Sequence, residues 1–283
     1  MAKRQKDVLE LIKSTPLSEK KRQTAKYILD NYTEASFLTA AELARRSSVS
    51  EPTVIRLAVD LGYAGFPEMR RALQDKVQGK LTTLSRLKGS HRFKASKNPA
   101  IQSLVTDMSN LENTLHDINT QTLNRVVNQI VQADKVIILG YKMSNCLAQF
   151  FQMALKKSID NTVAVTASPG QFQEDLVFTT AKSVVIAISF PRYTTAVVQD
   201  FRMAKQKGVT TIAITDSELA PLIDYATDYL LARCDSVSYI DSFAAAMSLL
   251  CAIATAVSIK SETKILPRLE KLEAMWEENE VFF

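Results

Sequence analysis

Hydroxyl and cationic side chains gather in two short segments, each directly after a run of apolar residues. The first segment reads Gly140-Tyr-Lys-Met-Ser144 and the second reads Ser189-Phe-Pro-Arg-Tyr-Thr194. Hydroxyls donate hydrogen bonds to phosphate or carboxylate oxygens, and the planar guanidinium of Arg192 offers a fork of donors to the same oxygens. The two segments therefore predict a site for a small anionic effector; an ion pair between Arg192 and a neighbouring subunit is the structural alternative. The candidate residues are Lys142, Ser144, Ser189, Arg192, Tyr193 and Thr194.

Residues that could transform such an anion are sparse. Acid–base chemistry on such a ligand needs a positioned base, usually a carboxylate or a histidine. The two histidines, His91 and His116, lie outside both segments, and the nearest carboxylates, Glu174, Asp175 and Glu218, stand in no motif. The 7 glycines form no G-x-G-x-x-G array, which argues against a nucleotide loop. We predict binding without turnover, with no catalytic residue, cofactor or metal.

Five short β-branched runs, separated by helical segments, occupy the chain from residue 134 onward. This alternation predicts an α/β domain over residues 128–260, in which helices cover both faces of a five-stranded parallel sheet. The two polar segments follow the first and third runs, so both lie at the carboxyl edge of the sheet, where open α/β folds bind ligands. Ser238 and Ser242, which follow the fifth run, are second candidates. The runs are 135–140, 162–166, 183–189, 210–215 and 228–233.

The remaining sequence is helical, and its charge is unevenly distributed. Residues 1–94 contain 19 Lys and Arg against 10 Asp and Glu, a net charge of +9, whereas the rest has 16 against 20. This excess favours a polyanionic partner for the first part, although a basic solvated surface has the same composition. Helical spacing predicts an all-α domain over 1–78, a linker over 79–99, a connecting helix over 100–127 and a final helix over 261–283.

Residues 38–74 carry the pattern of a helix-turn-helix. Thr39 is placed to cap a first helix, residues 47–49 form the turn, and Ser50 is placed to cap a second helix that has Pro52 in its first turn. An ordinary helical hairpin is the alternative. If the second helix enters the major groove of DNA, its outward groups contact bases, whereas nearby groups contact phosphates. The base-contact candidates are Ser50, Glu51, Thr53 and Arg56, and the phosphate-contact candidates are Arg45, Arg46 and Ser48; Thr39 is a further DNA-binding candidate.

The stretch ELARRSSVSEPTVIRLAVDLGYAGFPEMRRAL resembles the helix-turn-helix of the RpiR (MurR/RpiR) family of bacterial transcriptional regulators. Regulators of this family join that unit to a sugar isomerase (SIS) domain, and residues 128–260 resemble one in their order of strands and helices. The resemblance implies that Ser144, Ser189 and Thr194 bind the phosphate of a phosphosugar. The family usually shows Gly-x-Gly-x-Ser and Ser-x-Ser-Gly-x-Thr. This chain has Lys142 for the second glycine of the first pattern, and Pro191-Arg192 for the Ser-Gly of the second.

We therefore expect a DNA-binding regulator that responds to a phosphorylated sugar or related anion. Its expected partners are a double-stranded DNA operator, the effector, and further copies of itself in a homodimer or homotetramer. A sugar-phosphate isomerase with a DNA-binding appendage, and a SIS-like module that only oligomerises, are the alternatives. The sequence lacks an apolar run of membrane-span length and an N-terminal signal, which predicts a cytoplasmic protein without membrane partners. Cys146, Cys234 and Cys251 form no close pair and are expected to be buried thiols.

Overall fold

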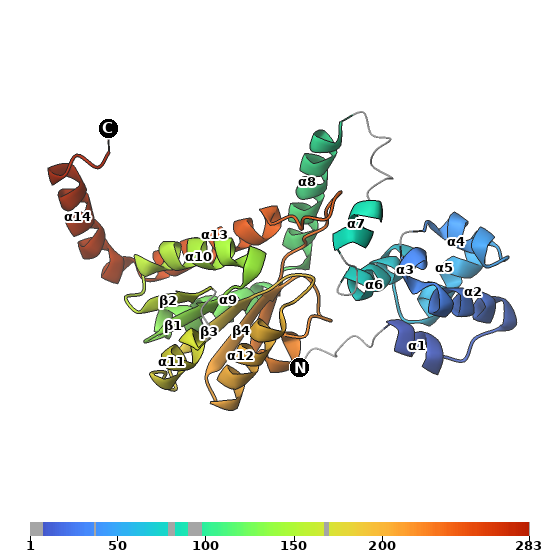
Figure 1. The fold of residues 1–283 in the computed structure, drawn as a ribbon, viewed down its shortest axis with the longest axis horizontal. Helices are drawn as coiled ribbons and strands as arrows, with labels where there is room; N and C mark the ends of the chain where they lie inside the picture. Colours follow the sequence, from blue (N-terminus) through green and yellow to red (C-terminus); the bar gives the residue numbers. More distant parts are fainter. Residues whose placement is uncertain (1–7, 37, 79–82, 90–97, 167–169, 283) are drawn as a thin grey trace. The chain divides into compact units, whose positions relative to one another are not determined.

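The computed structural model describes residues 8–36, 38–78, 83–89, 98–166 and 170–282, which divide into two compact units between Thr82 and Thr83 (Figure 1). The first unit is helical throughout its described residues. Apolar side chains at helical spacing, including Val8, Ile28, Leu43 and Leu57, enclose its single core. Its helices are α1 (Val8–Ser14), α2 (Glu19–Asp30), α3 (Tyr32–Ala35), α4 (Ala40–Arg46), α5 (Glu51–Asp60) and α6 (Phe66–Gln78).

The second unit begins with three helices, and these differ in part from the pattern expected from the sequence. The segment 79–99, expected to be a linker, contains α7 (Thr83–Gly89). The helical stretch expected from residue 100 onward consists of two helices, α8 (Pro99–Asp117) and α9 (Thr120–Gln132), so the connecting region expected over 100–127 extends from α8 into α9. The break arises because the Asn119 side chain accepts a hydrogen bond from the Thr122 N–H (3.0 Å) and so caps α9. Local capping chemistry therefore divides a stretch that is apolar and periodic on both sides.

A five-stranded parallel sheet forms the centre of this unit, as the sequence predicted. Its order is β2-β1-β3-β4-β5, so the chain runs outward in one direction from β1 and in the other from β3. The carboxyl ends of β1 and β3 therefore flank the point where the topology switches, which is the usual ligand position in such sheets. The strands are β1 (Val136–Leu139), β2 (Thr162–Val165), β3 (Val184–Ile188), β4 (Thr210–Thr215) and β5 (Asp228–Leu231).

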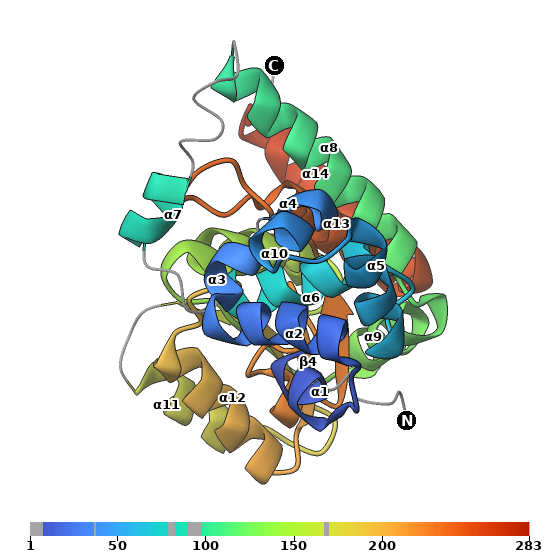
Figure 2. The same ribbon diagram turned by 90° about the vertical axis from the view of Figure 1, so that its right-hand side faces the viewer.

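Helices cover both faces of the sheet and complete a three-layer fold (Figures 1 and 2). Alternate residues of β1 enter different cores: Ile138 packs with α9, α10 and α13, whereas Ile137 packs with α11 and α12. Figure 2 shows α11 and α12 side by side on their face of the sheet. The helices are α10 (Asn145–Lys156), α11 (Gln171–Val177), α12 (Thr195–Gln206), α13 (Ala244–Lys260) and α14 (Glu262–Glu278), with short 3₁₀ turns at Lys142–Ser144 and Ile223–Tyr225.

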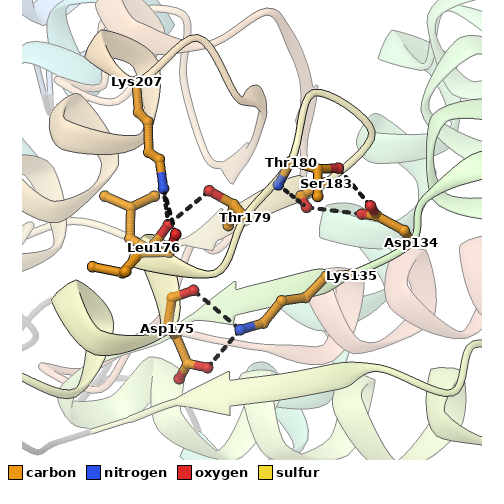
Figure 3. Close-up of polar contacts among 9 residues, drawn as sticks. Asp134, Lys135, Asp175, Leu176, Thr179, Thr180, Ser183 and Lys207 are labelled. Carbon is orange, nitrogen blue, oxygen red and sulfur yellow. Dashed lines mark hydrogen bonds and ion pairs between the residues drawn. The ribbon is translucent and has the colours of Figure 1, made fainter.

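Polar side chains form hydrogen bonds and an ion pair at the amino edge of the sheet, opposite the two predicted anion-binding segments (Figure 3). Just before β1, the buried Lys135 amine binds the Asp175 carboxylate at 2.8 Å and its carbonyl oxygen at 3.0 Å. The neighbouring Asp134 carboxylate accepts hydrogen bonds from the hydroxyls of Thr180 and Ser183, and the bond from Thr180 is the main cause that lowers the pKa of Asp134. These contacts hold α11 and the loop before β3 against the amino end of β1.

The cysteines differ from the expectation that all three thiols are buried. Cys234 is buried, but Cys146 and Cys251 are exposed. Cys146 lies at the start of α10, whose inward face consists of Leu147, Ala148, Phe151 and Leu155, so the thiol points away from the core. Among the described residues no single helix has the length and apolarity of a membrane span; α13 and α14 meet that criterion only when joined across a 99° bend.

Candidate functional site

The first helix of the helix-turn-helix begins at a complete capping box. The Thr39 hydroxyl accepts a hydrogen bond from the Glu42 N–H (3.2 Å), and the Glu42 carboxylate accepts one from the Thr39 N–H (2.8 Å). Thr39 is therefore engaged in starting α4, although its side chain is exposed. Arg45 and Arg46, in the last turn of the same helix, are also exposed, as contact with phosphates requires.

The turn between α4 and α5 uses a left-handed residue that is not glycine. Ser48 has a φ of 56°, and the Val49 N–H reaches back to the Ala44 carbonyl at 2.9 Å. Ser47, by contrast, is buried, and its hydroxyl binds the Leu43 carbonyl at 2.6 Å. This arrangement leaves Ser48 as the exposed hydroxyl at the corner, where we expected a phosphate contact.

Three of the four residues of α5 and its cap that were predicted to face outward are exposed. Ser50, Glu51 and Arg56 are exposed, but Thr53 is buried with only 6% of its surface accessible. Thr53 lies next to Val54 on the inward side of the helix, and its hydroxyl pairs with that of Ser50 at 2.8 Å. Ser50 occupies the cap position of α5 without making a capping hydrogen bond to its backbone. Thr53 therefore supports the turn and does not face outward as expected.

Two apolar residues on α5 complete the outward face and were missed by sequence reasoning. Ile55 and Val59 are 41% and 54% exposed, one turn apart, beside Arg56. Helical periodicity could have found them: Ile55 follows Pro52 by three residues and Val59 follows Ile55 by four, and residues at these spacings share one face of a helix. Apolar side chains at such positions can contact the methyl group of thymine in the major groove.

In the second unit, the segment after β1 is shaped by close backbone packing. A Cβ at Gly140 would lie 2.6 Å from both the Ala148 Cβ and the Ser144 carbonyl oxygen, so only glycine fits there. Ser144 is buried at the N-terminal end of α10, and its hydroxyl is not used to cap that helix. Lys142 is exposed and has a φ of 54°, the left-handed conformation that favours glycine. Gly140 thus brings Ser144 and the start of α10 directly onto the end of β1.

The segment after β3 has the same construction. Ser189 is buried, and its N–H binds the Ile214 carbonyl of β4 at 3.1 Å. Arg192 is exposed with a φ of 65°, again a left-handed conformation in a residue with a side chain. The Thr194 hydroxyl accepts a hydrogen bond from the Val197 N–H and caps α12. Lys142 and Arg192 therefore keep the backbone conformation of glycine while adding positive charge, and such strained positions typically occur at functional sites.

A buried carboxylate beside these segments is a candidate that the sequence did not reveal. Asp216 follows β4 and is 3% exposed; its Oδ1 accepts hydrogen bonds from the Tyr193 hydroxyl (2.7 Å) and the Thr215 hydroxyl (3.2 Å). Its Oδ2 atom is buried without a hydrogen-bond partner. Burial raises the pKa of Asp216 to about 6, against the lowering effect of the bond from Tyr193. Tyr193 is thus held at this edge of the sheet by Asp216.

The raised pKa of Asp216 leads to a prediction about pH. Folding favours the neutral carboxyl, so its stabilising contribution is present below pH 4 and is lost as pH rises toward 6. Asp216→Asn should remove this dependence of the free energy of unfolding on pH. The dependence amounts to roughly 3 kcal/mol, because each pKa unit corresponds to about 1.4 kcal/mol. Tyr193→Phe should move the loss to higher pH. Urea unfolding across pH 4–8 measures both effects, and parallel profiles for wild type and Asp216→Asn would contradict the assignment.

The third hydroxyl cluster follows β5 and is partly engaged in fixing α8. The Ser242 hydroxyl donates a hydrogen bond to the Asp107 carboxylate at 2.5 Å, and Ser236 accepts one from the Ser238 N–H at 3.1 Å. Ser238 and Ser242 are both half-buried. Ser238 therefore remains a candidate for ligand contact, whereas Ser242 already has a structural partner.

Comparison with known proteins identifies both units. Residues 6–80 match the model of the helix-turn-helix domain of the rpiR family, and residues 129–256 match that of the SIS domain. The chain belongs to the rpiR family. Across 276 residues, or 95% of each chain, it is 23% identical to the HTH-type transcriptional regulator HexR of Pseudomonas aeruginosa. This rpiR-family chain is therefore a helix-turn-helix transcriptional regulator that carries a SIS domain.

Two solved structures share the fold of this rpiR-family chain. The sugar isomerase domain of an RpiR transcription factor from Sphaerobacter thermophilus has a TM-score of 0.59 at 24% identity, covering 62% of this chain and 98% of that domain. The NanR protein of Vibrio vulnificus, complexed with ManNAc-6P, has a TM-score of 0.57 at 21% identity, covering 95% of this chain and 98% of its own. Both likenesses confirm the expected α/β SIS architecture.

The acidic residues considered as catalytic bases in the rpiR-family chain are not gathered at the two segments. Asp175 is bound to Lys135 at the opposite edge of the sheet, and Glu174 is exposed on α11. Glu218 accepts a hydrogen bond from the Tyr229 hydroxyl at 3.0 Å. His116 is exposed on α8, whereas His91 lies outside the described residues. Within the described part of the chain, no group of three His, Cys, Asp or Glu residues could hold a metal ion.

Proposed function

We propose that the SIS domain of this regulator binds a phosphorylated sugar or a related small anion between the segments that follow β1 and β3. One observation carries the proposal: a buried hydroxyl residue, Ser144 in the first segment and Ser189 in the second, lies at the topological switch point, and each segment also contains a left-handed cationic residue. Hydroxyls, the first N–H groups of α10 and α12, and the side chains of Lys142 and Arg192 together form a donor set suited to phosphate oxygens.

The likeness to NanR supports this class of ligand, because that protein is complexed with a phosphorylated amino sugar. Lys142 and Arg192 stand where the family usually has glycine. Their side chains add positive charge, so they favour a ligand with more negative charge or a more exposed anionic group. We accordingly include sugar acids with sugar phosphates. Binding of the anion without turnover then acts on DNA binding through a difference in affinity between two arrangements of the protein.

For the first unit, we propose that α5 enters the major groove of an operator in the cytoplasm. Arg56, Glu51 and Ser50 are exposed at its N-terminal part, the end that contacts base edges in this motif. The exposed Arg45, Arg46 and Ser48 lie at the end of α4 and in the turn, and we assign them to phosphates.

We further propose that the active form is a homodimer joined through α8. Six large apolar side chains form one stripe along its exposed face, whereas its other face is anchored to the body by Asn110, which binds the Asp235 carbonyl at 2.8 Å. A second copy of the same helix fits this stripe, because an isologous contact pairs a surface with itself and also supplies a second reading helix for a paired operator site. The stripe consists of Ile101, Leu104, Val105, Met108, Leu111 and Leu115.

Arg192→Ala should abolish the response of operator binding to the anion. Arg192 is exposed in the segment that begins at Ser189, and alanine removes its fork of donors without altering the core. Thermal-shift screening against sugar phosphates, sugar acids and amino sugars identifies the ligand, and titration of a DNA probe then measures the response. Arg202→Ala is the matched control, because Arg202 is an exposed arginine on α12 away from both segments. An undiminished response in Arg192→Ala would place the effector elsewhere.

Asp216 favours a second candidate function, that of a sugar-phosphate isomerase. Its buried carboxyl has a pKa raised to about 6 and lies beside the proposed anion site, as a general base would. Turnover of a sugar phosphate by the purified chain, lost in Asp216→Asn, would support this function. Ligand binding without turnover would exclude it for the ligand tested.

A further inference from the structure

Helix α7 is attached to the SIS domain by a largely buried ion pair. The Arg86 guanidinium binds the Asp241 carboxylate in the loop between β5 and α13, and the two side chains are only 10% and 15% exposed. Removing one partner of such a pair leaves an uncompensated charge in a poorly solvated position, which is strongly unfavourable. The short segment expected to be a linker is therefore a docked helix.

A second contact joins α7 to the proposed anion site itself. The Arg192 guanidinium donates a hydrogen bond to the hydroxyl of Thr83, the first residue of α7. Arg192 is also the cation that we assign to the anion. The same side chain is therefore shared between α7 and the ligand.

The charge of Arg86 acts at this same end of the sheet. Burial raises the pKa of the Cys234 thiol, and the carboxylates of Asp216 and Asp241 raise it further, whereas Arg86 lowers it. Asp241 likewise adds to the raised pKa of Asp216. Releasing Arg86 would therefore leave the charge of Asp241 uncompensated near Asp216, so the docked position of α7 is electrostatically linked to that end of the sheet.

The chain connects α7 closely to the DNA-binding unit. Helix α6 ends at Gln78 and α7 begins at Thr83, so only residues 79–82 separate them. A fully extended chain spans at most about 3.6 Å per residue, which limits the distance between these two ends to roughly 18 Å. A displacement of α7 beyond that reach must move the end of α6.

We propose that α7 is a clasp that holds the anion-free SIS domain and is released when an anion binds Arg192. The inference rests on the anion site proposed above. A phosphate or carboxylate offers Arg192 a charge-assisted, bidentate partner, which is stronger than the neutral hydroxyl of Thr83. Loss of that bond removes one of the contacts that attach α7 to the SIS domain, and a seven-residue helix has little stability of its own in water. Release then alters the attachment of the helix that follows α6 in the chain by only four residues.

Hydrogen exchange of the α7 amides in the full chain tests the clasp. Exchange should increase when inorganic phosphate, or an anion found by thermal shift, is added to the wild type. Arg86→Gln and Asp241→Asn should show the faster exchange of the α7 amides without any anion. Both variants should also change operator affinity in the absence of ligand. They should bind the anion at least about fivefold more tightly, because anion binding no longer competes with the docking of α7.

Arg233→Gln is the matched control, since it breaks a comparable pair with Asp117, with side chains 15% and 23% exposed, that does not involve α7. This variant should leave exchange in α7 and anion affinity unchanged. If an anion binds through Arg192 but α7 exchange stays constant, the clasp is overturned and the proposed function stands. If neither phosphate nor any sugar phosphate or sugar acid binds, both fail.

Discussion

Arg56→Ala is expected to weaken operator binding by about ten- to a hundredfold and to relax the sequence preference at the base pair that Arg56 contacts. An arginine that reads a base edge typically contributes about 1–3 kcal/mol to discrimination. The side chain is exposed on α5, and its Nε donates to the Pro52 carbonyl at 3.2 Å, which directs the guanidinium toward the start of the helix. That end of the helix is the one we expect at the base edges.

Two controls separate base contact from general electrostatics. Arg45→Ala removes a proposed phosphate contact, and should reduce affinity equally for all sequences and decrease the salt dependence by about one counterion. Arg22→Ala removes an exposed arginine of α2 that contacts Glu19 at 3.5 Å and the Leu17 carbonyl at 3.2 Å, and should have little effect on specificity. Competition binding between the operator and single-base variants measures the preference. An unchanged preference in Arg56→Ala would show that α5 does not read bases through this residue.

Met108→Asp is expected to dissociate the dimer and thereby to abolish specific DNA binding. Met108 is 69% exposed at the middle of the apolar stripe on α8. In a two-fold dimer both copies contribute this residue to the interface, so one substitution introduces two aspartates there. An unpaired carboxylate buried between two apolar stripes costs several kcal/mol. Because a paired operator site needs two reading helices, losing the dimer weakens DNA binding far more than losing one side-chain contact.

Ser109→Asp is the control for this variant. Ser109 is an exposed neighbour on α8 that lies outside the stripe, so the same charge there should leave association intact. Sedimentation velocity reports the mass of each variant, and DNA binding is measured on the same samples. A dimeric Met108→Asp that still binds its operator would mean that another surface joins the copies, such as α14 with its exposed Leu266 and Met275.

Much of the architecture followed from local pattern. Short β-branched runs separated by helical segments predict a parallel sheet because each run is buried on both faces, and all five strands occur where the runs lie. Thr39, with Glu42 three residues later, marks the start of α4 by a hydrogen-bonding rule that involves only neighbours. The two hydroxyl segments were found because both follow strands, and parallel strands end at the same edge.

Other features depended on contacts between residues far apart in the chain. Thr53 was assigned to the outward face because its neighbours are polar, but packing of α5 places it beside Val54. Asp216 gave no signal, because a single carboxylate after a strand is common; only burial and the Tyr193 hydroxyl, 23 residues away, make it unusual. Residues 79–99 were expected to be a linker because they are rich in Lys, Arg and Ser and are interrupted by Gly89 and Pro99, whereas Arg86 of α7 binds Asp241, which is 155 residues away in the chain.

The sequence by itself indicated the helix-turn-helix, the parallel sheet and the hydroxyl residues of the proposed anion site, since each rests on periodicity or on chemistry within a few residues, and its resemblance to known regulators indicated the family. The tertiary structure decided which side of α5 is exposed, which carboxylate lies buried beside the site, and that α7 is docked there. The physical reason is that burial and charge pairing depend on distances between segments, and a one-dimensional pattern does not contain those distances until the chain has folded.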